Sequence, residues 1–600
     1  MAFTGYLFLP FVLLALILYY ALPLKNRWIV LLVFSFLFFC TWGTDYVPMI
    51  LGLTLIAWLG GRLIDFRYNK ASLKKKESQK ENAEKETEGQ KTEQTIVLKR
   101  KNKKVLLVFA ALLIFILVYV KAQKSLIGIS FMEPVIRTVS NIHESFQNLL
   151  LRIPYVGDLI SSGKGIDSVL FHWLFGSGET NFTPIIQTME LSSAISATAE
   201  DALAEADVIY TWIIPIGISY YCLSLIGYLA DVYWKKERAE TNCFKLLLFT
   251  LYFPKILEGP ISRYRNIGKQ LVEGHKFDYT RVCFGLQRML WGFFKKLVIA
   301  DHLAMIVNTV YTDCQSYTGS ILLVAAIFGA VQLYCDFSGC MDIALGVSEC
   351  FGITLEENFK QPFASRSAAE FWRRWHITLG AWFKDYVFMP LAISPRLMKI
   401  SSFLRKKLGK RAGKIFLNVI PLAVVWLLTG LWHGTGANYL IWGVYWGLLI
   451  ILSNVFEPEI RKLTAKLKID TASPGFHFFQ KSRTFGLFVI SRIITLPETL
   501  EGTWYSIQSI FTNFAPWKLV DGSLYKLGID RPQFFVTMLA IVFVGFVGSK
   551  HEKGIHIREW IAARPIVIRW LIYYGAIFAI LIFGAYGPGY DAGSFVYMQY

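Results

Sequence analysis

The chain has 600 residues, of which 54% are hydrophobic and only 18% are charged. A soluble protein cannot bury so much apolar surface, so the composition excludes a soluble domain and indicates a membrane protein with many spans. The formal net charge is +19. Because many basic residues stand in short stretches beside apolar runs, we attribute this charge to orientation in the membrane and contact with anionic lipid, and not to nucleic-acid binding.

The eight cysteines are scattered along the chain and form no Cys-X-X-Cys pair. They are interpreted as small buried apolar residues. No metal site is predicted, because the histidines have no cysteine or carboxylate at ligand spacing. The N-terminal run lacks the basic region and the cleavage site of a signal peptide, so it is interpreted as a retained first span.

Apolar stretches that could enter a bilayer occur throughout the chain, and a full crossing needs roughly 20 apolar residues. They lie near residues 5–22, 28–42, 46–64, 105–122, 208–231, 244–258, 283–300, 318–335, 413–431, 437–455, 485–497, 533–548 and 566–587. Several are short and are expected to form tilted, broken or re-entrant helices. We therefore expect an all-α polytopic protein of the cell membrane.

The first loops predict the orientation of the chain. The turn after the second apolar stretch contains no Lys or Arg, whereas residues 65–104 are rich in both. The positive-inside rule then places the N-terminus outside and residues 65–104 in the cytoplasm. The Lys- and Glu-rich tract in this loop is expected to be disordered. The acidic segment 123–207 is expected outside the cell, and the topology of residues 244–300 is left open.

A dense polar group follows the apolar run that starts near Ile321. It includes Ser338, and on a helix Gln332, Asp336 and Gly339 would share one face. Such a face at membrane depth must point into the protein. Two interpretations stay open: a polar network that locks helices together, or direct contact with a substrate.

Aromatic and basic residues alternate in a second polar segment, from Glu370 to Tyr386. Trp372 and Arg374 are typical of residues that hold a helix at the headgroup level. His376 is a stronger functional candidate, because its surroundings are too polar for a full span and too aromatic for a free loop.

His433 lies between two apolar runs that are each long enough to enter a bilayer. A titratable ring there costs free energy unless it is paired or functional. A neutral imidazole can accept a proton from a hydroxyl group and return it to a leaving thiolate, as acyl transfer requires. Thr429, one helical turn earlier, could orient the ring, and apolar walls are expected from Trp426, Trp432 and Trp442. The alternative is a structural histidine that forms hydrogen bonds.

A set of short motifs stands in order along the chain. They are Phe8-Leu-Pro10 with Trp42-Gly43, Pro215-Ile-Gly217-Ile-Ser219-Tyr220, Phe253-Pro254 with Gly259-Pro260-Ile-Ser-Arg263-Tyr264, Gly292-Phe-Phe-Lys295-Lys296 with Ala300-Asp301, Asp336-Phe-Ser-Gly339, Phe371-Trp-Arg-Arg-Trp-His376, Leu431-Trp-His433-Gly434, and Phe595-Val-Tyr-Met-Gln-Tyr600. Together they resemble the membrane-bound O-acyltransferase (MBOAT) family, and within it the membrane subunits of bacterial alginate O-acetylation. Three positions depart from the family pattern: Cys340, Gly380 and Trp446.

The resemblance implies the MBOAT fold, with about 11–13 transmembrane or half-spanning helices around a central tunnel. It implies that His433 is the catalytic residue and that His376 lies nearer the cytoplasmic mouth. The expected tunnel or supporting residues are Asp336, Ser338, Gln332, Asn438, Trp432, Thr429 and Arg374. The expected parts are N-terminal transmembrane helices over 1–70, a charged loop over 71–104, a transmembrane helix over 105–122, an extracellular insertion over 123–207, the catalytic core over 208–456 and C-terminal transmembrane helices over 457–600.

The implied activity is transfer of an acyl group, acetyl above all, from a cytoplasmic thioester to a cell-surface polysaccharide. The donor would be acetyl-CoA or an acyl carrier, with no tightly bound cofactor. The acceptor would be reached directly or through a secreted or membrane-anchored partner that resembles an acyltransferase or esterase. Two alternatives remain: D-alanyl transfer to teichoic acid and, from another class, a proton-coupled transporter.

Overall fold

The computed structural model describes residues 1–81, 88–126, 217–434 and 436–586. Within these ranges the chain is helical and contains no strand. The chain divides into two compact units. The first comprises Met1–Leu257 and Arg263–Lys276, and the second comprises Glu258–Ser262 and Phe277–Tyr600.

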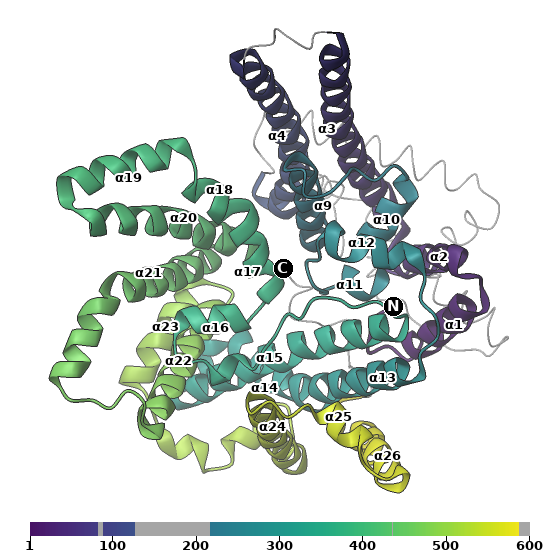
Figure 1. Cartoon of the computed structure of the whole chain (residues 1–600). Coiled ribbons are helices and arrows are strands. Elements are labelled where there is room, and N and C mark those ends of the chain that lie inside the picture. Colours follow the sequence, from purple (N-terminus) through teal and green to yellow (C-terminus); the bar gives the residue numbers. More distant parts are fainter. Residues whose placement is uncertain (82–87, 127–216, 435, 587–600) are drawn as a thin grey trace, which may run out of the picture. The chain divides into compact units, whose positions relative to one another are not determined.

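In the first unit, two long helices pack side by side (Figure 1). They are α3 (Val47–Glu81) and α4 (Glu88–Leu126), and each contains one apolar segment long enough to cross a membrane. The other α-helices described in this unit are α1 (Phe8–Ala21), α2 (Arg27–Cys40), α9 (Ile218–Tyr233), α10 (Cys243–Leu251), α11 (Phe253–Ile256) and α12 (Tyr264–Glu273).

The structure differs from the prediction over the charged tract at 71–104. There α3 continues to Glu81 and α4 begins at Glu88, so most of the tract is helical. Lys, Glu, Gln and Ala are good helix formers, and a helix that has already formed can lengthen without a new nucleation step. The tract therefore extends two helices past their apolar segments. The predicted insertion at 123–207 lies outside the described residues, apart from the end of α4.

The second unit contains the longest apolar helix of the chain, α15 (Gly319–Cys350). The predicted span at 318–335 therefore continues through the polar group that follows it. The other helices are α13 (Tyr279–Phe293), the π-helix η4 (Phe294–Ala300), α14 (Asp301–Thr312), α16 (Ala368–Arg374), α17 (Ile377–Phe383), the π-helix η7 (Lys384–Phe388), α18 (Met389–Ala392), α19 (Pro395–Leu408), α20 (Lys410–His433), α21 (Ala437–Lys466), α22 (Pro474–Thr495), α23 (Leu500–Thr512), α24 (Arg531–Glu552), α25 (Ile557–Ala562) and α26 (Ile566–Phe583). Short 3-10 turns connect several of them.

Within the described part of the chain, seven helices are long and apolar enough to cross a membrane. The number rises to eight if residues 377–392 and α19, which meet at an angle of 60°, form one broken span. Shorter apolar helices such as α1 add half-spanning candidates. The protein is therefore an all-α, multi-pass membrane protein, as its composition predicts.

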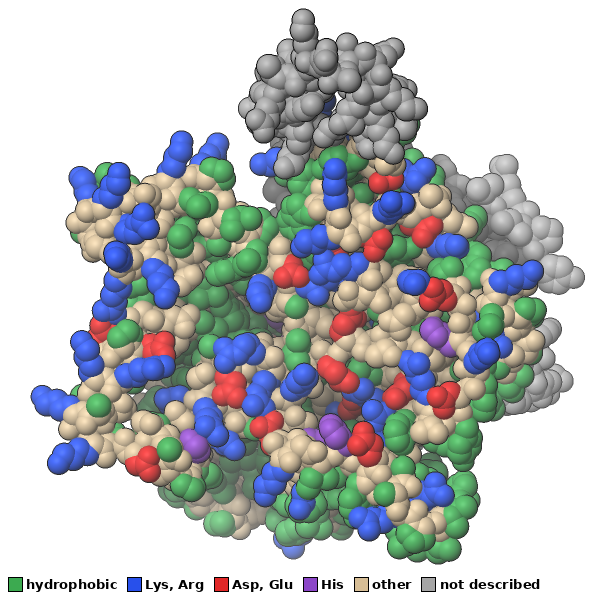
Figure 2. Space-filling model, in the orientation of Figure 1, with side chains coloured by type: hydrophobic (Ala, Val, Ile, Leu, Met, Phe, Trp, Pro, Cys, Tyr) green, Lys and Arg blue, Asp and Glu red, His purple; other side chains and the backbone are tan. Residues whose placement is uncertain are grey.

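The hairpin of α19 and α20 carries basic and apolar side chains together on its surface. Residues 395–414 contain no Asp or Glu, and the exposed residues of α19 include Met398 and Phe403 as well as several Lys and Arg. Figure 2 shows Lys and Arg side chains gathered over this hairpin. Such a combination is typical of a helix that lies at a membrane surface.

Helices α13 and α15 approach each other closely through two pairs of glycines. A Cβ atom added to Gly292 would lie 2.6 Å from the carbonyl oxygen of Gly339. One added to Gly285 would lie 2.6 Å from the carbonyl oxygen of Gly346. Small residues at a helix crossing let the two backbones pack directly against each other, which is a common way to hold helices together in membranes.

We expect the substitution Gly292→Val to destabilise the protein, because the new side chain must push α13 away from α15. Overpacking of this kind costs about 1–3 kcal/mol and should lower the melting temperature of the purified protein in detergent. The matched control is Gly545→Val in α24, where an added Cβ has no neighbour within 4 Å. Equal melting temperatures of the two variants would contradict this account of the crossing.

Candidate active site

His433 is the last residue of α20, and the helix ends there because Gly434 adopts an extended backbone. The imidazole is buried and lies between two indole rings. The ring centroids of Trp432 and Trp442 are each 4.8 Å from that of His433, and both pairs meet edge to face. Two of the three tryptophans expected as walls, Trp432 and Trp442 on α21, thus contact the ring.

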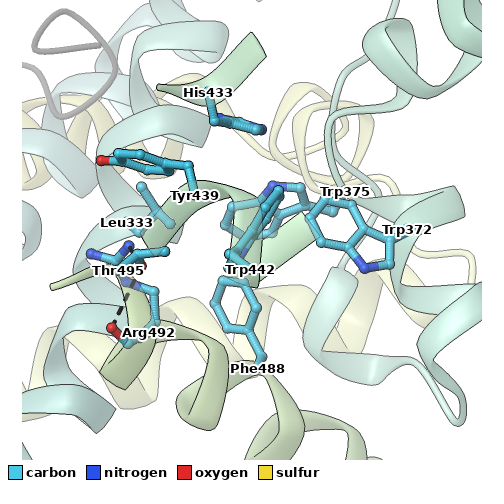
Figure 3. Close-up of a pocket in the computed structure, with 9 residues that line it drawn as sticks. All are labelled: Leu333, Trp372, Trp375, His433, Tyr439, Trp442, Phe488, Arg492 and Thr495. Carbon is cyan, nitrogen blue, oxygen red and sulfur yellow. Dashed lines mark hydrogen bonds between the residues drawn. The ribbon is translucent and has the colours of Figure 1, made fainter. Parts of the chain in front are cut away.

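A cavity of about 30 Å³ opens beside this histidine. Since one water needs roughly 10–15 Å³ by the same measure, the cavity has room for about two waters or a group of similar size. Helices α15, α16, α20, α21 and α22 and the residue after α16 contribute its walls (Figure 3). The lining residues are Leu333, Trp372, Trp375, His433, Tyr439, Trp442, Phe488, Arg492 and Thr495.

The close crossing of α20 and α21 brings these walls together. A Cβ atom added to Gly430 would lie 2.7 Å from the carbonyl oxygen of Tyr439, and one added to Gly443 would lie 2.7 Å from that of Trp426. Trp426 does not line the cavity but packs behind it, with its ring centroid 4.9 Å from that of Trp372. The glycines thus allow a layer of tryptophans to enclose the histidine.

Arg492 on α22 is the one cationic side chain among the described residues that line the cavity. It is 5% exposed, and its Nη1 donates a hydrogen bond to Thr495 Oγ1 at 2.9 Å. The sequence analysis did not identify this residue. The available signal was a basic residue inside the short apolar stretch at 485–497, where a charge is costly.

His376 adopts a left-handed backbone conformation, with φ of 46°. Asn358 holds this backbone in place. Its carbonyl oxygen accepts the N–H of Ile377 at 3.0 Å, and its side-chain Oδ1 accepts the N–H and the hydroxyl of Thr378 at 3.0 and 2.9 Å. Asn358 is 1% exposed and was also missed by the sequence analysis.

The same amide determines which nitrogen of His376 carries the proton. The atom that receives the backbone N–H of Thr378 must be the amide oxygen, because an N–H group can only donate. His376 Nδ1 lies 3.3 Å from this oxygen. Nδ1 must therefore be protonated to form the bond, which leaves Nε2 as the acceptor of the neutral ring.

His376 is connected to His433 through an aromatic contact and does not itself line the cavity. The ring centroid of Trp432 lies 5.8 Å from that of His376 and 4.8 Å from that of His433. Phe337 of α15 packs edge to face on His376, with the ring centroids 4.8 Å apart. The structure thus brings together three residues predicted for the site: His433, Trp432 and His376.

Asp336 and Ser338 lie in a buried network of charges away from the cavity lining. Lys296 Nζ contacts Asp336 Oδ1 at 2.6 Å and Asp301 Oδ1 at 2.8 Å. Lys295 Nζ contacts Ser338 Oγ and Asp342 Oδ2, both at 2.7 Å. These contacts join η4, α14 and α15, and they favour the interpretation of a polar network that locks helices together.

The other predicted residues are dispersed. Gln332 is buried on α15 outside the cavity lining. Asn438 Nδ2 donates to the carbonyl oxygen of Pro497 at 2.8 Å, which ties α21 to the chain after α22. Arg374 pairs with Glu370 at 2.9 Å and with Glu552, which agrees with a structural role.

The expected contact between Thr429 and His433 was wrong. The Thr429 hydroxyl donates to the carbonyl oxygen of Val425 at 2.7 Å, within its own helix. A threonine inside a helix commonly satisfies its hydroxyl in this way, because the carbonyl four residues earlier is within reach. The ring of His433 is instead held by its two tryptophan neighbours.

These observations place the chain in one class of protein: multi-pass helical membrane proteins in which a buried histidine faces a small, mostly aromatic cavity. Residues 235–480 match the sequence model of the membrane-bound O-acyltransferase family, MBOAT. The chain is therefore similar to this family over that stretch. His376 and His433 both lie inside the matched stretch, and Arg492 lies beyond it.

Three curated relatives illustrate the range of the family. The chain is 31% identical over 338 residues to the probable alginate O-acetylase AlgI of Pseudomonas syringae pv. tomato, covering 56% of this chain and 59% of the relative. It is 30% identical over 276 residues to the peptidoglycan O-acetyltransferase of Helicobacter pylori, covering 42% and 49%. It is 31% identical over 251 residues to the teichoic acid D-alanyltransferase of Bacillus subtilis, covering 41% and 60%. The matched part thus spans about three fifths of the alginate relative.

We expect Lys296→Met to destabilise the protein strongly, because it leaves Asp336 and Asp301 buried without their shared cation. Removing one partner of a buried ion pair costs about 3–5 kcal/mol. The melting temperature in detergent measures this loss. Lys462→Met, at an exposed position of α21, serves as the control, and a Lys296 variant as stable as this control would argue against the network.

Proposed function

We propose that the protein is a membrane O-acyltransferase that moves an acetyl group from a thioester donor to a cell-surface polysaccharide. One observation carries the proposal: His433, inside the stretch that matches the MBOAT family, faces a small, partly open cavity. An imidazole in such a place can exchange a proton with reactants that bulk water does not reach. The named activities of the three relatives, which transfer acetyl or D-alanyl groups to alginate, peptidoglycan or teichoic acid, support the same class of reaction.

In the proposed reaction, one ring nitrogen of His433 accepts the proton of an attacking hydroxyl group. The hydroxyl oxygen forms a bond to the thioester carbonyl carbon, and the carbon–sulfur bond then breaks. The leaving thiolate takes the proton back from the imidazolium, so the histidine ends as it began. Burial between Trp432 and Trp442 restricts the ring to the orientation that this exchange requires.

His376 is proposed to support the reaction from the far side of Trp432. With its Nδ1 proton directed at Asn358, the neutral ring offers Nε2 as a hydrogen-bond acceptor. The positive φ of His376 fits such a role, since strained backbone is found most often at functional sites.

Arg492 favours acetyl over D-alanyl as the transferred group. A D-alanyl group carries an ammonium charge, whereas acetyl is neutral. Two positive charges about 5 Å apart repel each other by about 3 kcal/mol at an effective dielectric constant near 20. The small volume of the cavity also suits acetyl, which has three heavy atoms.

We further propose that the thioester, acetyl-CoA or an acyl carrier, is cytoplasmic and that the acetyl group leaves on the outer side. This arrangement lets the bulky, charged thioester remain in the cytoplasm while only the small acetyl group crosses the membrane. The acceptor would be the polysaccharide itself or a secreted or membrane-anchored partner that completes the transfer. The N-terminus would lie outside and residues 65–104 in the cytoplasm.

We expect His433→Ala to abolish acetylation of the cell-surface polysaccharide, because His433 is the one histidine among the described residues that line the cavity. Ester-bound acetate on isolated polysaccharide is the measurement, with the amount of protein in the membrane checked in parallel. The control is His556→Ala, at an exposed position. Acetylation that persists in the His433 variant would refute the assignment, and proton-driven solute uptake without acyl transfer would favour the transporter.

We expect Asn358→Asp to shift the pH profile of activity. Aspartate keeps an acceptor oxygen for Thr378 but places a negative charge beside His376, which stabilises the imidazolium and raises its pKa. Burial lowers the pKa of the wild-type ring to about 3, so the loss of activity caused by protonation of His376 should begin roughly 1–2 pH units higher in the variant, because activity requires the neutral ring. Asn454→Asp, at an exposed position of α21, is the control. An unchanged profile in a stable Asn358 variant would contradict the positioning role.

A further inference from the structure

Arg492 combines deep burial with a place in the wall of the cavity that contains His433. It projects from α22, and Figure 3 shows its side chain with Thr495 on the opposite side of Tyr439 from the histidine. It lies beyond the stretch matched by the family model, residues 235–480. Nothing in the shared motifs therefore explains why a cation stands here.

The charge of Arg492 is not balanced by a carboxylate in the part of the chain that the structure describes. Its Nη1 donates to Thr495, but its Nε is buried without an acceptor there. The rest of the cavity lining consists of aromatic residues, one leucine, one threonine and the histidine. A buried guanidinium with a donor left over is costly, and a ligand that brings an acceptor oxygen to this donor would offset the cost.

Other buried cations of the same unit behave differently. Lys296 lies against two carboxylates, and Arg288 contacts both Asp342 and Glu357. The fold therefore pairs its structural cations with acidic residues. Arg492 departs from this pattern, because it lines the cavity without an acidic partner among the described residues. The cavity is where an anionic or strongly polarised oxygen of a substrate would bind.

We propose that Arg492 binds the carbonyl oxygen of the acyl group and stabilises the negative charge that develops on it during transfer. The inference rests on the proposed function. When the hydroxyl oxygen attacks the thioester carbon, the electron pair of the carbonyl moves onto its oxygen, and the guanidinium N–H groups donate to it. When the carbonyl re-forms, the electrons of the carbon–sulfur bond leave with the thiolate, which His433 protonates.

The guanidinium is suited to this task for two physical reasons. Its planar donors keep their charge at any pH that the protein experiences. In a cavity with room for only about two waters, a fixed donor needs no reorganisation as the charge develops, so its effect on the transition state is larger than in solution. The same charge raises the affinity of the cavity for a small carboxylate, which resembles the intermediate in charge.

The first experiment measures release of CoA from acetyl-CoA by the purified full-length protein in lipid nanodiscs. We expect Arg492→Gln to lower kcat about 100-fold, as loss of an oxyanion donor does elsewhere, with KM changed less than threefold. Arg492→Lys, which keeps the charge, should recover part of the loss. The control is Arg483→Gln, an exposed position on the same helix, which should keep kcat within twofold. A stable Arg492→Gln variant with an unchanged kcat, or with a changed KM alone, would overturn the proposal.

The second experiment does not depend on turnover and uses acetate as the probe. Millimolar sodium acetate should raise the melting temperature of the wild-type protein and of Arg483→Gln, because a ligand that binds the native state stabilises it. The rise should disappear in Arg492→Gln. If the wild type releases no CoA, the proposed donor reaction fails and the acetate result alone decides on Arg492. A wild type that acetate does not stabilise, at equal ionic strength with chloride as reference, would refute the anion site.

Discussion

The structure depends on one constraint: a charge buried in a largely apolar protein must be compensated or it destabilises the fold. In the second unit Lys296 meets this condition through Asp336 and Asp301, and these contacts join η4, α14 and α15. The compensated charges hold helices together, and the glycine contacts between α13 and α15 let the same helices approach closely. Lys296 is thus compensated by carboxylates. Arg492, the buried cation that lines the described cavity, still has a donor that a ligand can satisfy.

A second set of contacts controls the geometry of the two histidines. Asn358 receives four donors from residues 376–378, one at its backbone carbonyl and three at its side-chain oxygen, and so determines both the backbone turn and the protonated nitrogen of His376. Trp432 then lies against His376 and His433 at once. Because Trp432 and His433 are adjacent at the end of α20, the position of one ring limits the position of the other. The two motifs, 57 positions apart, are thereby parts of one arrangement.

The sequence predicted what local patterns determine. The apolar runs at 413–431 and 437–455 lie within α20 and α21, and the break between them placed His433 at a helix end. It could not predict Asn358 or Arg492, because the importance of each depends on neighbours far along the chain or on the cavity that it faces. The Thr429 prediction failed for a related reason: spacing along a helix shows that contact is possible, but not that a nearer carbonyl already holds the hydroxyl. The charged tract at 71–104 misled because polar composition was taken as disorder, although its residues favour helix.

The choice between acyl groups depends on which of two effects in the cavity is larger. Indole rings attract cations, so Trp372, Trp375 and Trp442 by themselves would bind the ammonium of a D-alanyl group. Such an attraction is worth about 2 kcal/mol when desolvated. Repulsion from the guanidinium of Arg492 is about 3 kcal/mol at 5 Å and increases as the local dielectric constant falls. The three indole rings would all act on a single ammonium group. The charge of the guanidinium acts on every position in so small a cavity. The net effect disfavours a cation, which supports the proposal that the tryptophans serve as apolar walls for a neutral acetyl group.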